Sequence, residues 1–258
     1  MHNTGTDTPT DEPVRVWNAA GRGGVVLICE HASNHIPALY AQLGLPPQAL
    51  QTHIAWDPGA LDVARHMAQH LEAPLVHGTV SRLVYDCNRP PEALGAMTVR
   101  SETTDIPGNR NLTEADRRAR VTQIYDPFHR CVAEVLKDAP AAPVLVTIHS
   151  FTPVYAGQRR SVEIGLLHDT DSRLADAMLA IPQQRQVARN APYGPQDGVT
   201  HTLQRHALPR GMLNVMIEIR NDLITNADSC AAMAKDLAHW ITSALDGLAQ
   251  VPGRAVPR

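Results

Sequence analysis

The chain has 258 residues and a formal net charge of −3, with 23 Lys and Arg against 26 Asp and Glu. This length suits one α/β domain with a sizeable core and is short for two. The slight acidic excess argues against nucleic acid or an anionic membrane as a partner, because both bind basic surfaces.

Histidine and cysteine usage narrows the chemistry further. Thirteen histidines are many for this length and favour metal or acid–base chemistry. The four cysteines are widely spaced and form no Cys-x-x-Cys pair. We therefore expect neither a disulfide framework nor a zinc site made of cysteines. The cysteines are Cys29, Cys87, Cys131 and Cys230.

The two ends differ from the chain between them. Residues 1–13 are rich in Thr, Asp and Pro, which predicts a disordered tail. Residues 251–258, with two prolines and a glycine, predict a frayed C-terminus. No apolar segment typical of a signal peptide or a membrane span is present, so a cytoplasmic location is expected. Residues 14–250 then form a single domain.

Strands and helices alternate along this domain. Short, apolar, β-branched runs predict five buried strands, and apolar residues at helical spacing predict the helices between them. The predicted strands are Val25–Glu30, Pro74–Val80, Val144–His149, Val162–His168 and Val215–Arg220. The predicted helices are Ala60–Leu71, a long helix capped by Thr113 and kinked or divided at Pro127, Ser172–Ala180 and Asp228–Leu248.

This alternation predicts a three-layer α/β/α domain with a mainly parallel mixed sheet. In such sheets, binding sites form just beyond the carboxyl ends of the strands. Polar residues gather at these points in the sequence, where a plain scaffold does not need them. They are Glu30 and His31, Ser81 and Arg82, Asp86–Arg89, His149 and Ser150, His168 and Asp169, and, inside the last strand, Glu218 and Arg220.

A metal site is predicted among these residues. Catalytic zinc takes three nitrogen or oxygen ligands and keeps one position open. His31 and His149 lie at strand ends that can be neighbours, and Asp57 precedes a helix, where it can cap the helix or bind metal. Two rival ligands remain open: His35, spaced i,i+4 from His31, and Glu30, which strand alternation would point the other way.

The sequence supports neither a nucleotide-binding loop nor the nucleophile elbow of a serine hydrolase. The run Gly21–Gly24 precedes a strand and does not join a strand to a helix, so it is no nucleotide-binding loop. A Gly-x-Ser-x-Gly nucleophile elbow is absent from the sequence.

At the residues that follow the strands, the chain resembles the N-formylglutamate amidohydrolase family. The matching segments follow the family's order and span most of Val25 to Ile224. They are Glu30–Asn34 with Ile36 and Pro37, Asp57–Ala60, Ser81–Pro90, Thr147–Pro153 and Glu218–Ile224.

This family is in turn distantly similar to zinc carboxypeptidases and aspartoacylases, so the resemblance implies a zinc-exopeptidase-like (phosphorylase/hydrolase-like) fold. Those enzymes use a His-x-x-Glu metal motif. Here the matching spacing from His31 reaches Asn34, which is a poor zinc ligand and is assigned to substrate binding. Asp57 is therefore expected to supply the carboxylate, with Asn34 and Glu30 left as alternatives.

The resemblance also implies roles for the remaining residues. One zinc ion per chain is expected, held by His31, Asp57 and His149. Glu218 is expected to move the proton and Arg82 to stabilise the oxyanion. The substrate-binding residues are Asn88 and Arg89, which look like a carboxylate clamp, together with Arg220 and Asn34.

The implied activity is metal-dependent hydrolysis of an N-acyl amino acid, with N-formyl-L-glutamate as the family's substrate. The partner is then a small molecule, and neither nucleic acid nor membrane is expected. One alternative is another N-acyl amino acid or peptide-like amide, and a second is a non-catalytic metal- or ligand-binding domain. The sequence leaves open the oligomeric state, the pathway, the metal used in the cell and the roles of His35, His129, His201 and His206.

Overall fold

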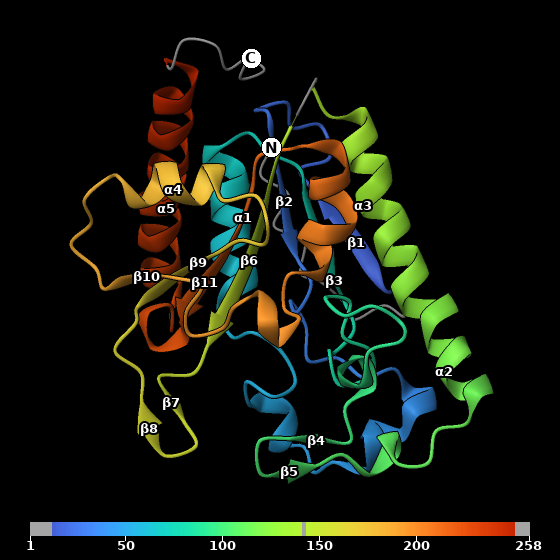
Figure 1. Cartoon of the computed structure of the whole chain (residues 1–258). Helices are drawn as coiled ribbons and strands as arrows, with labels where there is room; N and C mark the ends of the chain where they lie inside the picture. Colours follow the sequence, from blue (N-terminus) through green and yellow to red (C-terminus); the bar gives the residue numbers. More distant parts are fainter. Residues whose placement is uncertain (1–11, 141–142, 251–258) are drawn as a thin grey trace.

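A computed structural model of the chain describes residues 12–140 and 143–250 (Figure 1). The predicted C-terminal end at 251–258 lies outside the described residues, and so does the predicted N-terminal tail apart from Glu12 and Pro13. These two residues lead directly into the first strand.

A seven-stranded mixed sheet forms the centre of the single α/β domain. Its strands, in spatial order, are β1 (Val14–Trp17), β3 (Leu75–Gly78), β2 (Val25–Cys29), β6 (Val144–Phe151), β11 (Asn214–Arg220), β9 (Ile164–Leu167) and β10 (Val187–Arg189). Neighbours from β3 to β11 are parallel, as are β9 and β10, whereas β1 pairs with β3 and β9 with β11 antiparallel. The predicted mainly parallel mixed sheet is confirmed.

The central strands are buried along their whole length because helices and loops cover both faces of the sheet. This double burial explains their nearly continuous apolar sequences. The edge strands β1 and β10 were not predicted, since each is only three or four residues long and includes an arginine. Two hairpins were also missed: β4 (Arg100–Ser101) with β5 (Thr104–Asp105), and β7 (Val154–Tyr155) with β8 (Gln158–Arg159).

Helices and loops build two apolar cores, one on each face of the sheet. One face packs against α1 (Ala60–His70), α4 (Arg173–Leu179) and α5 (Ala227–Ala249). The other packs against α3 (Asp126–Asp138), which lies on the opposite side of the sheet in Figure 1. Alternate residues of β2 point into the two cores: Leu27 enters the first core, and Val26 and Ile28 enter the second.

The long helix predicted after Thr113 is divided, as expected. Thr113 caps α2 (Glu114–Arg120) in a capping box with Asp116. A π-helical turn (Val121–Tyr125) then leads into α3, which carries Pro127 in its first turn. Because proline has no backbone N–H and its ring crowds the preceding turn, regular α-helical bonding is interrupted there.

Shorter helical turns complete the chain. They are Ala38–Gly44, Ala49–Gln51, Leu94–Met97, Pro107–Asn109, Pro195–Asp197, Leu203–Ala207, Leu208–Arg210 and Asn221–Leu223. None of the helices in the described ranges is both long and apolar enough to cross a membrane.

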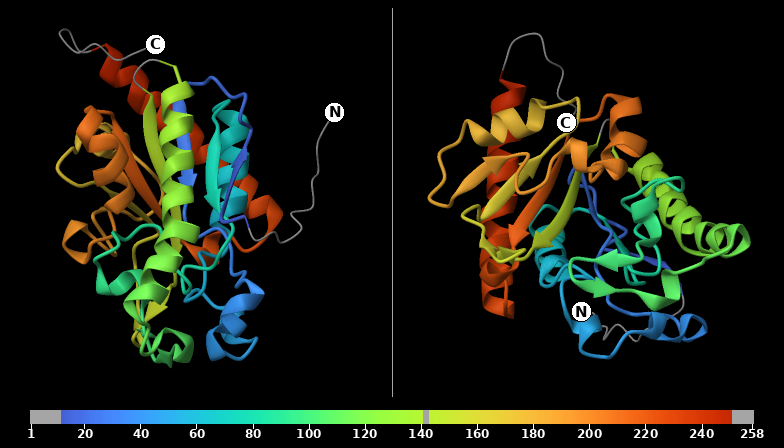
Figure 2. Two further views of the ribbon diagram at one scale, coloured as in Figure 1. Left: turned by 90° about the vertical axis from the view of Figure 1, so that its right-hand side faces the viewer. Right: turned by 60° about the horizontal axis from the view of Figure 1, so that its bottom comes forward.

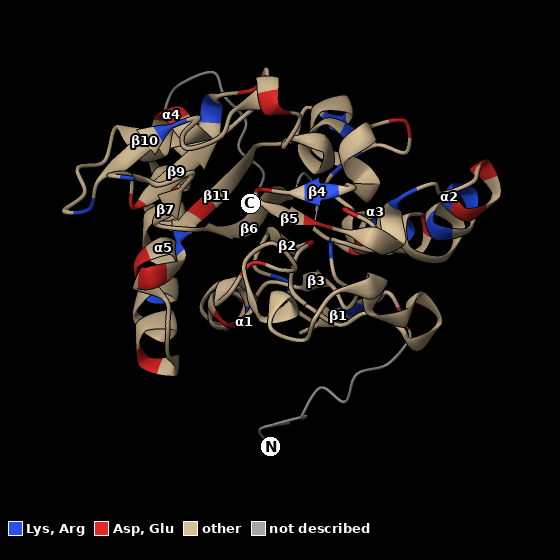
Figure 3. Ribbon diagram, turned by 90° about the horizontal axis from the view of Figure 1, so that it is seen from below, with Lys and Arg blue, Asp and Glu red and all other residues tan. Residues whose placement is uncertain are grey.

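The carboxyl ends of β2, β6 and β11 meet at one end of the molecule. Seen from that end in Figure 3, the β4–β5 hairpin lies in front of these strand ends, and the right-hand view of Figure 2 brings the same end forward. The hairpins and loops therefore surround the place where the site residues were predicted.

Candidate active site and metal centre

Three potential metal ligands come together beyond the strand ends. His31 follows β2, His149 lies near the end of β6, and Asp57 lies just before α1. All three are buried, and their candidate ligand atoms lie within 4.8 Å of one another. The sheet causes this convergence, because β2 and β6 are parallel neighbours and end at the same edge.

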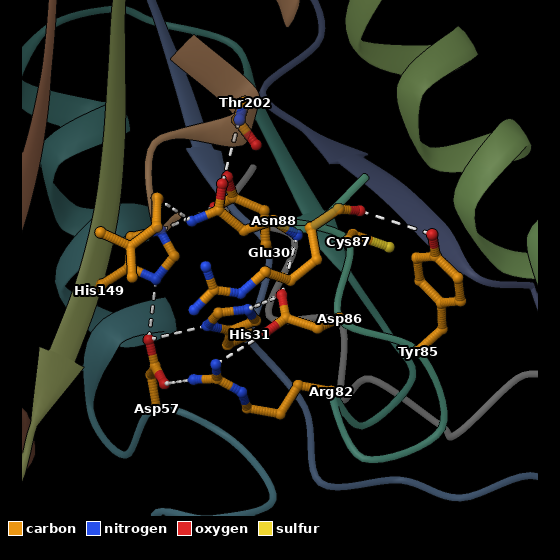
Figure 4. A network of polar contacts seen from close by, with 12 residues as sticks. Glu30, His31, Asp57, Arg82, Tyr85, Asp86, Cys87, Asn88, His149 and Thr202 are labelled. Carbon is orange, nitrogen blue, oxygen red and sulfur yellow. Dashed lines mark hydrogen bonds and ion pairs between the residues drawn. The ribbon is translucent and has the colours of Figure 1, made fainter. Parts of the chain in front are cut away.

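The geometry points both imidazoles at one carboxylate oxygen. Asp57 Oδ2 lies 3.3 Å from His31 Nδ1 and 2.9 Å from His149 Nδ1 (Figure 4). The two rings meet edge to face, with centroids 4.9 Å apart. Two nitrogens and one oxygen thus face the same small space, and this is a donor set that zinc accepts without sulfur.

Two further carboxylates hold the far sides of the imidazoles. Asp86 Oδ1 lies 2.7 Å from His31 Nε2, and Glu30 Oε2 lies 3.1 Å from His149 Nε2. The hydrogen bond to Asp86 favours the proton of His31 on Nε2, which leaves its Nδ1 lone pair for a metal. Glu30 therefore lies behind His149. Asp86 received no role from the sequence, although it belongs to the matching segment Ser81–Pro90.

The pKa values of His31, His149 and Asp57 are shifted from their usual values. Burial and Arg82 act to lower the pKa of His31, but Asp86 and Asp57 outweigh them and raise it. Burial likewise opposes the effect of Glu30 and Asp57 on His149, whose pKa is nevertheless raised well above its usual value. Asp57 stays ionised, because the two histidines lower its pKa against the effect of burial. A divalent cation at this point would displace protons, since ligating imidazoles are neutral.

The rival ligands are positioned differently. The segment after β2 is not helical, so His35 does not share a face with His31, and it lies outside the three-residue group. Asn34 donates a hydrogen bond from Nδ2 to the carbonyl oxygen of Leu50 at 2.8 Å. Neither residue lines the cavity described below.

Glu218 lies on β11 beside His149 of β6, at the same register position. Its carboxyl group is buried, and Oε2 has no hydrogen-bond partner among the residues that the structure describes. Burial raises the pKa of Glu218 to about 7, with a further contribution from Asp57. A carboxylate with a pKa near neutrality suits proton transfer.

Arg82 bridges two of these carboxylates. Its Nη2 lies 2.7 Å from Asp86 Oδ2, and its Nη1 lies 3.4 Å from Asp57 Oδ1. The side chain is 29% exposed, so one side of the guanidinium remains open. Asp86 therefore contacts both His31 and Arg82, and it couples their positions.

These groups line one cavity of about 370 Å³. The sequence-predicted residues in its wall are His31, Asp57, Arg82, Asn88, Arg89, His149 and Glu218. Tyr155 of β7, Arg100 and Ser101 of β4, and Glu102 of the β4–β5 turn also line it. The cavity thus combines a candidate metal position, a buried carboxyl group and arginines.

Comparison with known proteins shows the family of this chain. A family model described as N-formylglutamate amidohydrolase matches residues 23–225. This chain is a member of the N-formylglutamate amidohydrolase family. The match includes every residue placed in the cavity wall above. A search of curated proteins found no match.

Two solved structures resemble this family member. The crystal structure of a gene product from Agrobacterium tumefaciens is 55% identical, covers 93% of this chain and 97% of its own, and has a TM-score of 0.90. The N-formylglutamate amidohydrolase from Ralstonia eutropha JMP134 is 20% identical, with coverage of 89% and 96% and a TM-score of 0.58. At that identity, the second likeness shows a shared fold.

In this N-formylglutamate amidohydrolase family member, the two residues of the predicted carboxylate clamp, Asn88 and Arg89, make different contacts. Asn88 accepts a hydrogen bond from the backbone N–H of Thr202 at 3.0 Å and donates one to the carbonyl oxygen of Val199. Its amide thus ties two loops together. Arg89 donates from Nη1 to the carbonyl oxygen of Asp197 and keeps the rest of its guanidinium at the cavity.

Arg220 lies away from the cavity wall. Its Nε donates to Asp222 at 2.8 Å, and its Nη2 lies 3.7 Å from Glu163. The structure therefore does not bring Arg220 or Asn34 together with the other predicted substrate-binding residues. All four cysteines are free thiols, as the sequence predicted.

A second group of buried histidines lies near α3, and we name His129, His201 and His206 the α3 histidine cluster. His129 Nδ1 lies 2.8 Å from His206 Nε2, and His129 Nε2 lies 2.9 Å from the carbonyl oxygen of Cys87. His201 Nε2 lies 2.8 Å from the hydroxyl of Tyr125. The cluster thus contacts the segment that carries Asp86 and Asn88.

Proposed function

We propose that this chain hydrolyses the amide bond of an N-acyl amino acid in a metal-dependent reaction. The observation that carries the proposal is the placement of His31, Asp57 and His149 in one cavity with the buried carboxyl group of Glu218. N-formyl-L-glutamate is the first substrate to test, because both the family and the Ralstonia eutropha protein carry its name.

His31, Asp57 and His149 would hold one divalent ion, and their nitrogen and oxygen donors favour zinc. When bound, such an ion supplies Lewis acidity for water and for the acyl carbonyl group. Ligands at the carboxyl ends of parallel strands also support a distant, zinc-exopeptidase-like relationship. Asp86 and Glu30 hold the two imidazoles so that their Nδ1 atoms face the ion position.

Glu218 is the proposed proton carrier. It takes a proton from the attacking water, whose oxygen forms the new bond to the acyl carbon, and gives a proton to the departing nitrogen as the C–N bond breaks. N-formyl-L-glutamate would yield formate and L-glutamate. A pKa of about 7 lets the same carboxyl group accept and release a proton near neutral pH.

Arg82 is the proposed oxyanion group. Its contacts with Asp57 and Asp86 fix the guanidinium before substrate arrives, and a preorganised cation stabilises negative charge that develops only in the transition state. Arg89 is the proposed grip on the substrate's α-carboxylate, and Asn88 positions the loop that carries it. Arg220 and Asn34, which have other partners, receive no substrate contact in this proposal.

A non-catalytic binding domain is the alternative from another class. It is disfavoured because a binding site has no use for a proton carrier beside an oxyanion group. Hydrolysis of a different N-acyl amino acid remains within the proposal, since the chemistry is the same.

Elemental analysis combined with a formate-release assay tests the proposal. Protein purified without chelators should contain about one divalent metal ion per chain and release formate from an N-formyl amino acid. Removal of the metal should abolish release, and zinc should restore it. Full activity of metal-free protein would contradict the proposed role of His31, Asp57 and His149.

A further inference from the structure

We infer that Arg100, on the β4–β5 hairpin, binds the side-chain carboxylate of a dicarboxylate substrate. It thereby selects N-acyl amino acids with an acidic side chain over neutral ones of the same shape. This inference rests on the proposed function and assigns a residue to the second charge of N-formyl-L-glutamate. Three features support it: the cations of the cavity wall, the exposed ion pair of Arg100, and the anchoring of the hairpin.

The cavity wall offers a separate cation for each negative charge of such a substrate. Arg82, Arg89 and Arg100 all line it. In the proposed function, Arg82 faces the oxyanion and Arg89 binds the α-carboxylate, so a second carboxylate needs another partner. Arg100 is the third arginine of this wall, and a guanidinium can bind a carboxylate through two parallel hydrogen bonds.

The side chain of Arg100 is held by an exchangeable ion pair. It is 59% exposed, and its Nη1 lies 3.3 Å from Asp105 Oδ1. Such an exposed pair contributes little to stability, so a ligand can replace it at small cost. Arg110 Nη2 also lies 2.7 Å from Oδ2 of the same aspartate. Asp105 therefore keeps a cation when Arg100 turns to a substrate.

Two acidic residues of the surrounding loops also line the cavity, and both already accept hydrogen bonds. Glu102 Oε1 lies 2.8 Å from His53 Nε2, and an ionised carboxylate can only accept, so the imidazole donates. Asp197 Oδ2 accepts from the backbone N–H of Gly194 at 2.9 Å. These bonds stabilise the two carboxylates in the absence of Arg100. Its guanidinium thus remains available to offset the charge of a dianion.

A buried network fixes the base of the hairpin to the catalytic loop 82–89. Asn109 is fully buried and donates from Nδ2 to the carbonyl oxygens of Leu83 and Thr98, at 2.8 and 2.7 Å. Arg120 Nη1 donates to Asn109 Oδ1 at 2.7 Å and orients the amide. The hairpin, which lies in front of the strand ends in Figure 3, is therefore positioned against the catalytic loop before substrate binds.

Two other basic residues at the cavity are less suited to this role. His53 lines the cavity but already uses Nε2 on Glu102. Arg160 packs against rings of the wall, with its guanidinium carbon 4.7 Å from the Tyr155 centroid and 4.9 Å from the Tyr193 centroid. The two tyrosines line the cavity, whereas Arg160 is not part of its wall.

The test compares N-formyl-L-glutamate with N-formyl-L-glutamine, which has the same shape but lacks the second charge. Formate release by the zinc-loaded, full-length protein gives kcat/KM for each. The wild type should prefer glutamate by at least about tenfold, the effect of one charge-assisted hydrogen bond. Arg100→Gln should lower the value for glutamate by about 10- to 100-fold and that for glutamine by less than about threefold.

Arg110→Gln is the matched control. Arg110 pairs with the same Asp105 and is 54% exposed, but it does not line the cavity. It should leave the ratio of glutamate to glutamine unchanged. Because both arginines are largely exposed, neither substitution removes a buried side chain. Equal losses in the two variants would indicate a general charge effect of the hairpin and would overturn the inference.

Other outcomes separate this inference from the proposed hydrolysis. Formate release with equal kcat/KM for the two substrates, or with an unchanged ratio in Arg100→Gln, would overturn the inference and leave the hydrolysis standing. Loss of the glutamate preference in His53→Gln or Arg160→Gln, but not in Arg100→Gln, would also overturn it.

Calorimetric binding covers the opposite case, in which neither compound releases formate and the hydrolysis is wrong. Weaker binding of N-formyl-L-glutamate to Arg100→Gln than to the wild type, with N-formyl-L-glutamine unaffected, would still support the role of Arg100. Equal affinity of the two proteins for N-formyl-L-glutamate would overturn it.

Discussion

The molecule contains two groups of buried histidines, and their surroundings give them opposite properties. His31 and His149 contact carboxylates on both sides of each ring. The α3 histidine cluster contacts a tyrosine hydroxyl, a backbone carbonyl and another imidazole. The first pair has raised pKa values, whereas burial lowers the pKa of His129 to about 3 and those of His201 and His206 to about 4.

This difference shows that burial of histidines alone does not make a site. The carbonyl oxygen of Cys87 can only accept, so His129 carries its proton on Nε2. Neutral His129 then accepts at Nδ1 from the Nε2–H of His206. The α3 histidine cluster is thus neutral and supports the loop behind Asp86. The carboxylates beside His31 and His149 make that group the candidate position for a cation.

The largest effect is expected from a substitution beside His31 and His149. Asp57→Asn removes the charge that both Nδ1 atoms face, so metal affinity should fall by more than about 100-fold and activity should be lost with it. Metal content by elemental analysis and formate release measure this effect. A variant that keeps its metal and its turnover would remove Asp57 from the ligand set.

Glu218→Gln should separate chemistry from metal binding within the same group. The amide keeps the size of the side chain but cannot accept a proton, so turnover should fall by about 10²- to 10⁴-fold. Metal content should remain at the wild-type level, because Glu218 is not among the proposed ligands. Loss of metal from this variant, with retention in Asp57→Asn, would mean that the two roles are exchanged.

His206→Leu tests the α3 histidine cluster. It removes the donor to His129 Nδ1 and leaves a buried acceptor unsatisfied, which should cost about 1–3 kcal/mol in the free energy of unfolding. Chemical denaturation measures this loss, and bound metal should be unaffected. His206→Gln is the matched control, because its amide N–H can replace the lost donor. Equal stability of the leucine and glutamine variants would contradict the assigned tautomers.

The smallest expected effect is on the pH dependence of the protein's stability. Unfolded histidines titrate near pH 6.5, above the folded pKa values of the α3 histidine cluster. The unfolded state therefore binds more protons between about pH 6.5 and 4, so stability falls as the pH drops through this window. His206→Gln should reduce that slope by up to about 1.4 kcal/mol per pH unit. An unchanged slope in denaturation at pH 7 and pH 5 would show that His206 is charged when folded.

Local sequence patterns were sufficient for the centre of the fold and for part of the site. The central strands carry apolar runs because both sheet faces are covered, and Thr113 with Asp116 specifies a helix start without help from the rest of the chain. His31 and His149 could be grouped in advance because parallel strands end at a common edge, and the family resemblance led to Asp57 as the carboxylate.

Contacts between distant segments decided the rest. The edge strands β1 and β10 exist because neighbouring strands pair with them, and their short sequences carry little signal of their own. Arg220 shares a strand with Glu218, yet its long side chain pairs with Glu163 and Asp222. Asp86 holds the imidazole of His31, a residue that lies 55 positions earlier in the chain. Periodicity specifies which face a residue occupies, but the partner of a charged side chain depends on which segments the tertiary fold brings within reach.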